Sequence, residues 1–122
     1  MKTILVVDDS PSLRKDLQKL LQPYKSLKII GKAIDFASAI RQCTTLKPDI
    51  MILDIGLKNG TGIEVLAKSK KFLPAPIIIM FSNYSNGAFQ KAAKRLGADY
   101  FFDKTNDVEN LVSTLIDLSS KS

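Results

Sequence analysis

The sequence predicts one α/β domain built around a doubly wound parallel sheet. Short apolar runs rich in β-branched residues alternate with stretches in which apolar residues recur at helical spacing. The runs are continuously apolar, which is typical of strands buried on both faces of a sheet. A chain of 122 residues is long enough for one such core and too short for two.

Five runs predict strands, and a stretch of helical periodicity follows each of them. The expected strands are residues 4–7, 29–34, 50–53, 77–81 and 100–102. The apolar positions of the five expected helices are Leu13, Leu17, Leu20 and Leu21; Phe36, Ile40 and Cys43; Ile63, Leu66 and Ala67; Phe89, Ala92, Ala93 and Leu96; and Val108, Leu111, Val112 and Leu115. Strict alternation implies right-handed crossovers between parallel strands, and the expected strand order is 2-1-3-4-5, the flavodoxin-like arrangement.

Proline, serine and glycine residues mark the expected helix boundaries. Ser10 and Pro11 predict an N-cap followed by proline at the first helical position. Pro23 is expected to end that helix, and Gly97 stands where a C-cap glycine belongs.

The composition excludes several classes of site. Without histidine, the chain cannot form a His-based triad, a histidine metal site or a phosphohistidine carrier. Its one cysteine, Cys43, excludes an intrachain disulfide and a cysteine-cluster zinc site, and its surroundings favour a small core residue. No apolar run approaches the roughly 18 residues of a membrane helix, and no signal peptide is recognisable, so we expect a cytoplasmic protein.

The formal net charge of +6 raises the question of nucleic-acid binding. The lysines are scattered, however, and the one dense run, residues 68–71, falls at the end of an expected helix, where cations suit the helix dipole. A solvated helix end is therefore favoured over direct contact with nucleic acid.

Polar residues follow four of the five apolar runs. Asp8 and Asp9 come after the first, Asp54 after the third and Ser82 after the fourth, and Lys104 follows the fifth. In a doubly wound sheet these positions share one rim, where binding sites form. The carboxylates would repel one another unless a pKa rises or a cation binds, and oxygen ligands of this kind suit Mg²⁺. With the hydroxyl and the ammonium group, they describe a site for a phosphoryl group.

Each of these residues also has a simpler interpretation when taken alone. Asp8 and Asp9 could cap the first helix, Asp54 could belong to a turn, Ser82 could cap the fourth helix, and Lys104 could be an ordinary surface lysine. The joint pattern favours a site, because all of them occupy the same structural position on successive elements.

With these residues, the chain resembles the CheY-like receiver domains of two-component response regulators. The resemblance covers essentially all of residues 1–122, read as one receiver domain. It rests on four segments: ILVVDDS at 4–10, PDIMILDI at 48–55, PIIIMFS at 76–82 and GADYFFDK at 97–104.

The resemblance implies a phosphoacceptor and a metal site. Asp54 matches the aspartate that accepts the phosphoryl group. Asp9 and Asp8 match the acidic pair that holds Mg²⁺, with Asp54 and the backbone carbonyl of Gly56 as further ligands. The implied reaction is in-line transfer from a partner's phosphohistidine, and the domain would catalyse only its own phosphorylation and dephosphorylation.

The resemblance also implies a switch. Ser82 matches the switch hydroxyl, Lys104 the lysine that contacts the phosphoryl group, and Phe101 the switch aromatic. Phosphorylation would draw Ser82 inward, let Phe101 turn into the space released, and shift the surface formed by the fourth helix, fifth strand and fifth helix.

Three residues depart from the usual receiver pattern. Lys58 replaces the proline four residues after the acceptor, so we expect a less constrained loop there. Thr105 replaces the proline after Lys104, and we predict a trans peptide bond, because a non-proline cis bond costs roughly 2.5–4 kcal/mol. Tyr84 stands where small residues are common, and we expect it to restrict attacking water and prolong the phosphoryl state.

We expect a stand-alone receiver, because Met1 precedes the first strand directly and the last helix ends near Ser122. A domain excised from a longer regulator and a carrier within a phosphorelay stay open as alternatives. The expected partners are a sensor histidine kinase or histidine phosphotransfer protein and a downstream protein target. Opposite charges near residues 91–95 and 99–117 could support a phosphorylation-dependent homodimer, although a solvated surface is the simpler interpretation.

Other classes of function fit less well. An aspartyl phosphatase would need a second aspartate where this chain has Gly56. A flavin-binding protein would need a phosphate loop where Asp8 and Asp9 would repel the phosphate. A nucleic-acid adaptor stays testable by salt-dependent binding.

Overall fold

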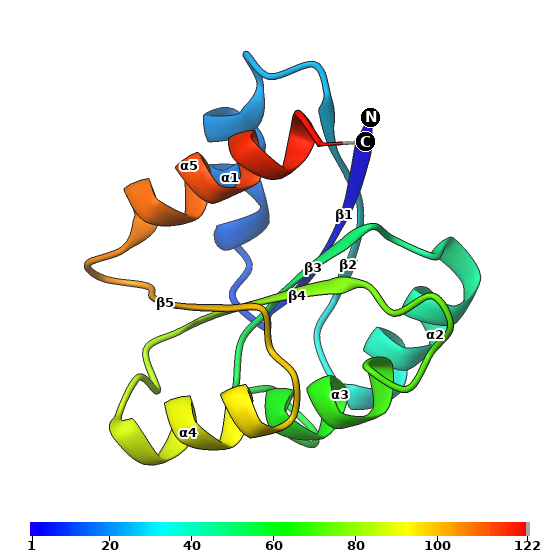
Figure 1. The fold of residues 1–122 in the computed structure, drawn as a ribbon, viewed down its shortest axis with the longest axis vertical. Coiled ribbons are helices and arrows are strands. Elements are labelled where there is room, and N and C mark those ends of the chain that lie inside the picture. Colours follow the sequence, from blue (N-terminus) through cyan, green and yellow to red (C-terminus); the bar gives the residue numbers. More distant parts are fainter. Residues whose placement is uncertain (122) are drawn as a thin grey trace.

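The computed structural model describes residues 1–121 and contains a five-stranded sheet between two layers of helices (Figure 1). The strands are β1 (Lys2–Val7), β2 (Leu27–Ala33), β3 (Ile50–Leu53), β4 (Ile77–Ser82) and β5 (Tyr100–Asp103). The helices are α1 (Leu13–Leu21), α2 (Phe36–Leu46), α3 (Gly62–Ser69), α4 (Gly87–Arg95) and α5 (Val108–Ser119). All neighbouring strands are parallel, and their order, β2-β1-β3-β4-β5, confirms the prediction.

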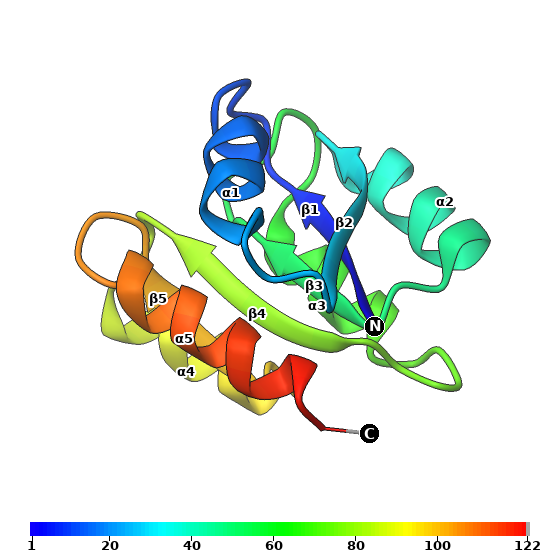
Figure 2. The same ribbon diagram turned by 90° about the horizontal axis from the view of Figure 1, so that it is seen from above.

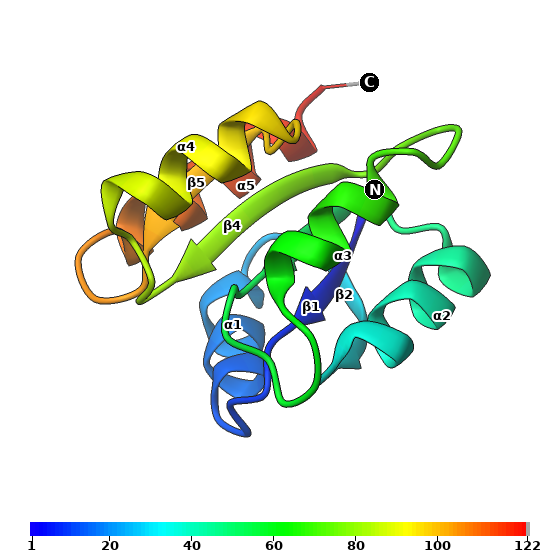
Figure 3. The same ribbon diagram turned by 90° about the horizontal axis from the view of Figure 1, so that it is seen from below.

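Two hydrophobic clusters, one on each face of the sheet, explain the continuously apolar strands. Ile4 and Val6 of β1 pack in the cluster under α1 and α5, whereas Leu5 and Val7 pack in the cluster under α2, α3 and α4. Figures 2 and 3 show the two helical layers from opposite sides. Cys43 is buried in the second cluster, as expected of a core residue, and burial raises the pKa of its thiol. Within residues 1–121 no helix is long and apolar enough to cross a membrane.

The expected start of the first helix is wrong. Helix α1 begins at Leu13 after Ser12, and the backbone N–H of Ser10 donates to Asp8 Oδ1 at 2.7 Å. The turn after β1 is thus organised by the Asp8 carboxylate, and not by a serine cap. Leu20, expected on the buried face, is 44% exposed, because the inward stripe of α1 is centred on Leu17 and Leu21.

The two expected helix ends are confirmed, whereas β2 begins and ends earlier than the expected 29–34, at Leu27 and Ala33. Helix α1 ends at Leu21, before Pro23. Gly97 follows α4 with a φ of +101°, a left-handed conformation that glycine adopts without the penalty of a side chain.

Helix α3 begins in close contact with the end of β3. Its first residue, Gly62, donates its N–H to Ile55 O at 2.8 Å, and a Cβ at Gly62 would lie 1.9 Å from the carbonyl oxygen of Asp54. Thr61 and Glu64 form a reciprocal capping box at this end of the helix. A residue without a side chain is therefore required where α3 meets the segment that carries Asp54.

We predict that Gly62→Ala lowers the free energy of unfolding by about 2 kcal/mol or more, because the backbone must move to admit the methyl group. Gly87 is the matched control, since it also begins a helix but a Cβ there would meet nothing within 4 Å. Gly87→Ala should raise the stability slightly, by about 0.5 kcal/mol. Urea denaturation of both variants checks the prediction, and equal effects at the two positions would contradict it.

Candidate functional site

The carboxyl ends of the strands bring the predicted site residues together, because parallel strands end at the same rim of the sheet. Asp8, Asp54 and Ser82 are buried there, with 2%, 6% and 0% of their surfaces exposed. Lys104, just after β5, reaches the same point, whereas Asp9 is exposed.

Both oxygens of the Asp54 carboxylate are held. Ser82 Oγ donates to Oδ1 at 2.5 Å, and Lys104 Nζ donates to Oδ2 at 2.8 Å. The N–H of Gly56 makes a longer contact with Oδ1, at 3.4 Å. The hydroxyl and the ammonium group expected at a phosphoryl site thus already contact the same carboxylate.

Lys104 also pairs with Asp8. Its Nζ lies 2.6 Å from Asp8 Oδ2. Burial alone would lower the pKa of Lys104, but its contacts with Asp54 and Asp8 outweigh burial and raise it. Burial raises the pKa of Asp8, against the lowering effects of Lys104 and of the Ser10 N–H.

Three carboxylates at this rim fit a divalent cation. Oxygen atoms of Asp8, Asp9 and Asp54 lie within 4.8 Å of one another. Hard oxygen ligands with one open side suit Mg²⁺, which usually keeps part of its water shell.

The loop after β3 is tied down by backbone hydrogen bonds. The N–H of Lys58 donates to Ile34 O at 3.4 Å, and Asn59 O accepts from the N–H of Phe36 at 3.0 Å. A proline in place of Lys58 could not donate this bond. The expectation of a less constrained loop therefore overlooked the attachment of this loop to the segment between β2 and α2.

The peptide bond between Lys104 and Thr105 is trans, as predicted. The N–H of Thr105, which a proline would lack, donates to Asp103 Oδ1 at 2.7 Å. Asp103 also accepts a bond from Ser85 Oγ at 2.7 Å, and these bonds lower the pKa of its carboxyl. The sequence patterns did not predict this contact, and its only local signal is the absence of proline after Lys104.

Tyr84 lies over the loop that follows β3. Its ring contacts Gly56 so closely that a Cβ on Gly56 would lie 2.6 Å from Tyr84 Cε2. The ring also packs edge-on against Phe89, with centroids 5.9 Å apart, and half of Tyr84 is exposed. An aromatic ring therefore stands beside the residues that flank Asp54.

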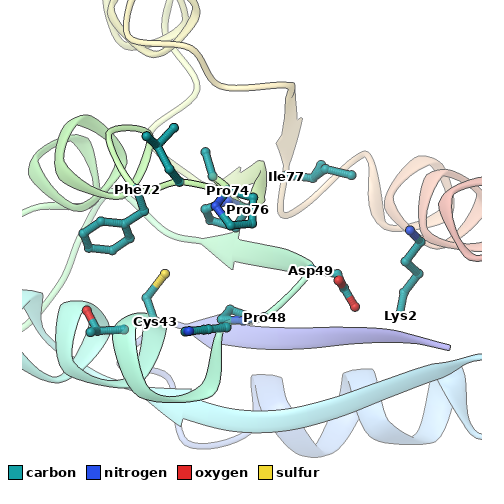
Figure 4. A pocket seen from close by; sticks show the side chains of 12 residues that line it. Lys2, Cys43, Pro48, Asp49, Phe72, Pro74, Pro76 and Ile77 are labelled. Carbon is teal, nitrogen blue, oxygen red and sulfur yellow. The ribbon is translucent and has the colours of Figure 1, made fainter. Parts of the chain in front are cut away.

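A cavity of about 440 Å³ lies at the opposite end of the strands (Figure 4). Prolines before β3 and β4 line it together with Phe72 and Cys43. None of the predicted site residues lines this cavity, so the candidate chemistry belongs to the rim.

A family model, the response regulator receiver domain, matches residues 4–116. This chain belongs to the response regulator receiver family. It is therefore a receiver domain of the two-component type, and the strand-end residues described above lie within the matched region.

Curated relatives support the assignment over most of the chain. A protein-glutamate methylesterase/protein-glutamine glutaminase 2 from Koribacter versatilis is 33% identical over 109 residues, which are 88% of this chain and 30% of the relative. The sensory transduction protein LytT from Bacillus cereus is 36% identical over 115 residues, 94% of this chain and 46% of the relative. The chain spans less than half the length of both relatives.

Solved structures agree with the fold. The response regulator domain of Thermotoga maritima CheB has a TM-score of 0.83 at 29% identity and covers 98% of this receiver and 93% of its own chain. A LuxR-family two-component response regulator from Aurantimonas has a TM-score of 0.88 at 26% identity, with 98% and 86% covered.

The Asp103 carboxylate should make the stability of this receiver depend on pH. Because folding lowers its pKa, its contribution is complete above the ordinary value of 3.8 and is lost as the pH falls through the lower, folded-state pKa. Asp103→Asn does not titrate. Urea denaturation at about pH 6 and about pH 3 should show a smaller loss of stability in the variant than in the wild type; equal losses would contradict the assignment.

Proposed function

We propose that this receiver accepts a phosphoryl group on Asp54 from a phosphohistidine of a kinase or phosphotransfer protein, and then signals to a protein target. The observation that carries the proposal is the buried Asp54 carboxylate, with Ser82 on one oxygen and Lys104 on the other. In this arrangement the proposed nucleophile, Asp54, lies in contact with Ser82 and Lys104, two hydrogen-bond donors for phosphoryl oxygens.

The reaction is a displacement at phosphorus. A carboxylate oxygen of Asp54 forms the new O–P bond while the N–P bond of the donor breaks, and the electron pair returns to the donor imidazole. Ser82 and Lys104 then turn their hydrogen bonds to the phosphoryl oxygens. Asp8, Asp9, Asp54 and the Gly56 carbonyl would hold Mg²⁺, which would neutralise charge on the phosphoryl group.

The proposed output surface is formed by α4, β5 and α5. Phe101 lies in a groove between α4 and β5, and packs partly against the cluster under α2, α3 and α4. Ser82 is already buried beside Asp54, so we propose that phosphorylation mainly shifts its hydrogen bond and biases Phe101 further inward.

The partners and the setting of the domain are part of the proposal. Helix α4 carries three basic residues and α5 two acidic ones, a distribution that would suit pairing of two phosphorylated copies across this surface. A stand-alone regulator, a phosphorelay carrier and a segment of a longer regulator all use the same chemistry. The proposed role is that of a signalling domain and not of an enzyme. The proposed location is the cytoplasm, where ATP is available to phosphorylate the histidine of the donor.

Incubation with Mg²⁺ and acetyl phosphate should add one phosphoryl group to the intact mass of the wild type and none to Asp54→Asn. Asp117→Asn, an exposed carboxylate on α5, is the control and should behave like the wild type. Chelation of the metal should abolish the gain. If the wild type gains no mass from acetyl phosphate or from a phosphohistidine donor, the proposed function is wrong.

Tyr84→Ala should shorten the life of the phosphoryl state. Removing a ring that lies over Gly56 opens the approach of water to the acyl phosphate. We expect a several-fold faster loss of phosphate, followed by intact mass over time after the donor is removed. Tyr24→Ala, at an exposed tyrosine before β2, is the control and should not change the rate; a rate for Tyr84→Ala at or below that of the wild type would refute the role.

A further inference from the structure

Ser82 ends β4 and Lys104 lies in the loop after β5, so the two side chains that contact Asp54 border two loops, and hydrogen bonds join these loops directly. The loop between β4 and α4 follows Ser82, and the loop between β5 and α5 contains Lys104. Three bonds connect them: Ser85 Oγ to Asp103 Oδ2 at 2.7 Å, Thr105 Oγ1 to Asn83 Oδ1 at 3.2 Å, and the Lys104 N–H to Ser82 O at 3.2 Å.

Asp103 is a fixed anchor for this connection. Its Oδ1 accepts the N–H groups of Thr105 and Asn106, at 2.7 and 3.2 Å, while its Oδ2 accepts the Ser85 hydroxyl. Its own N–H donates to Asp107 Oδ2 at 2.9 Å. The carboxylate therefore sets the path of the chain on both sides of Lys104.

Ser85 is held from the other side. Its carbonyl oxygen accepts a bond from Gln90 Nε2 of α4 at 2.7 Å, while its hydroxyl reaches Asp103. The hydroxyl is not a helix cap, because Asn86 caps α4 by accepting from the N–H of Phe89 at 3.0 Å. The Ser85 side chain thus serves the contact between the loops and not the helix start.

We propose that Ser85 and Asp103 are positioning residues for the acceptor site. Their hydrogen bond makes the loop that follows Ser82 and the loop that contains Lys104 move as one unit. The Ser82 hydroxyl and the Lys104 ammonium group therefore already contact Asp54 when a phosphodonor binds. This inference rests on the proposed function for its consequence in phosphoryl transfer, whereas the coupling of the loops stands on the contacts alone.

A departure of this chain from the usual receiver pattern strengthens the connection. The Thr105 N–H, together with the longer bond from the Asn106 N–H, holds the Asp103 carboxylate toward Ser85, and a proline at position 105 would lack the shorter of these two bonds. The Thr105 hydroxyl adds a second contact, to Asn83. Thr105 therefore supplies both a backbone bond to Asp103 and a side-chain bond to Asn83 in the other loop.

Hydrogen exchange in the unliganded protein tests the coupling without any phosphochemistry. In Ser85→Ala, the amides of Lys104 and Tyr84, which both donate to Ser82, should exchange about tenfold faster. Ser85→Thr keeps a hydroxyl and should restore slow exchange. Ser113→Ala removes a comparable hydroxyl from α5 and is the control. Unchanged exchange in Ser85→Ala would overturn the proposal.

The rate of phosphorylation by acetyl phosphate with Mg²⁺ tests the consequence. Ser85→Ala should slow it several-fold, and Ser85→Thr should recover it. In an Asp103→Ala background, Ser85→Ala should cause no further loss, because the partner of the hydroxyl is already gone. Additive effects, or a wild-type rate in Ser85→Ala, would overturn the positioning role. A wild type that accepts no phosphoryl group would refute the proposed function instead, and the exchange measurement would still decide the coupling.

Discussion

One ammonium group between two buried carboxylates holds the functional rim together. Lys104 Nζ lies 2.6 Å from Asp8 and 2.8 Å from Asp54, whose side chains are almost fully buried. Without this cation, the two carboxylates would repel each other and push the strand ends apart. Because removal of one partner of a buried pair leaves an uncompensated charge, the rim requires a cation at this point.

The same constraint prepares the rim for chemistry. Three carboxylates around one ammonium group leave an excess of negative charge, which favours a divalent metal; the metal and the ammonium group would then attract the oxygens of a phosphoryl group. The exposed Asp9 adds negative charge at the open side, and Ser82 fills the remaining position on Asp54. Stability and the proposed reactivity therefore arise from one arrangement of charges.

Backbone hydrogen bonds restrict two loops at positions where the usual receiver pattern has proline. At Lys58 the N–H ties the loop after β3 to the segment before α2, and at Thr105 the N–H organises the Asp103 carboxylate. A proline restricts a loop through its fixed φ, whereas these residues restrict theirs through donors that a proline lacks. At Thr105 the side chain also links the loop of Lys104 to the loop that follows Ser82.

The order of the elements, the buried parallel sheet and the four strand ends that carry the candidate site could be predicted from the sequence, because apolar periodicity and the residues that interrupt it are local patterns. Which atoms pair depends on the folded structure. The double contact of Lys104, the ring of Tyr84 over Gly56 and the bond from Ser85 to Asp103 join segments far apart in the chain or loops without a periodic pattern. The mistaken cap at Ser10 is a local exception: the Asp8 carboxylate at the end of β1 accepts the Ser10 N–H and organises a turn, and helix α1 begins only at Leu13.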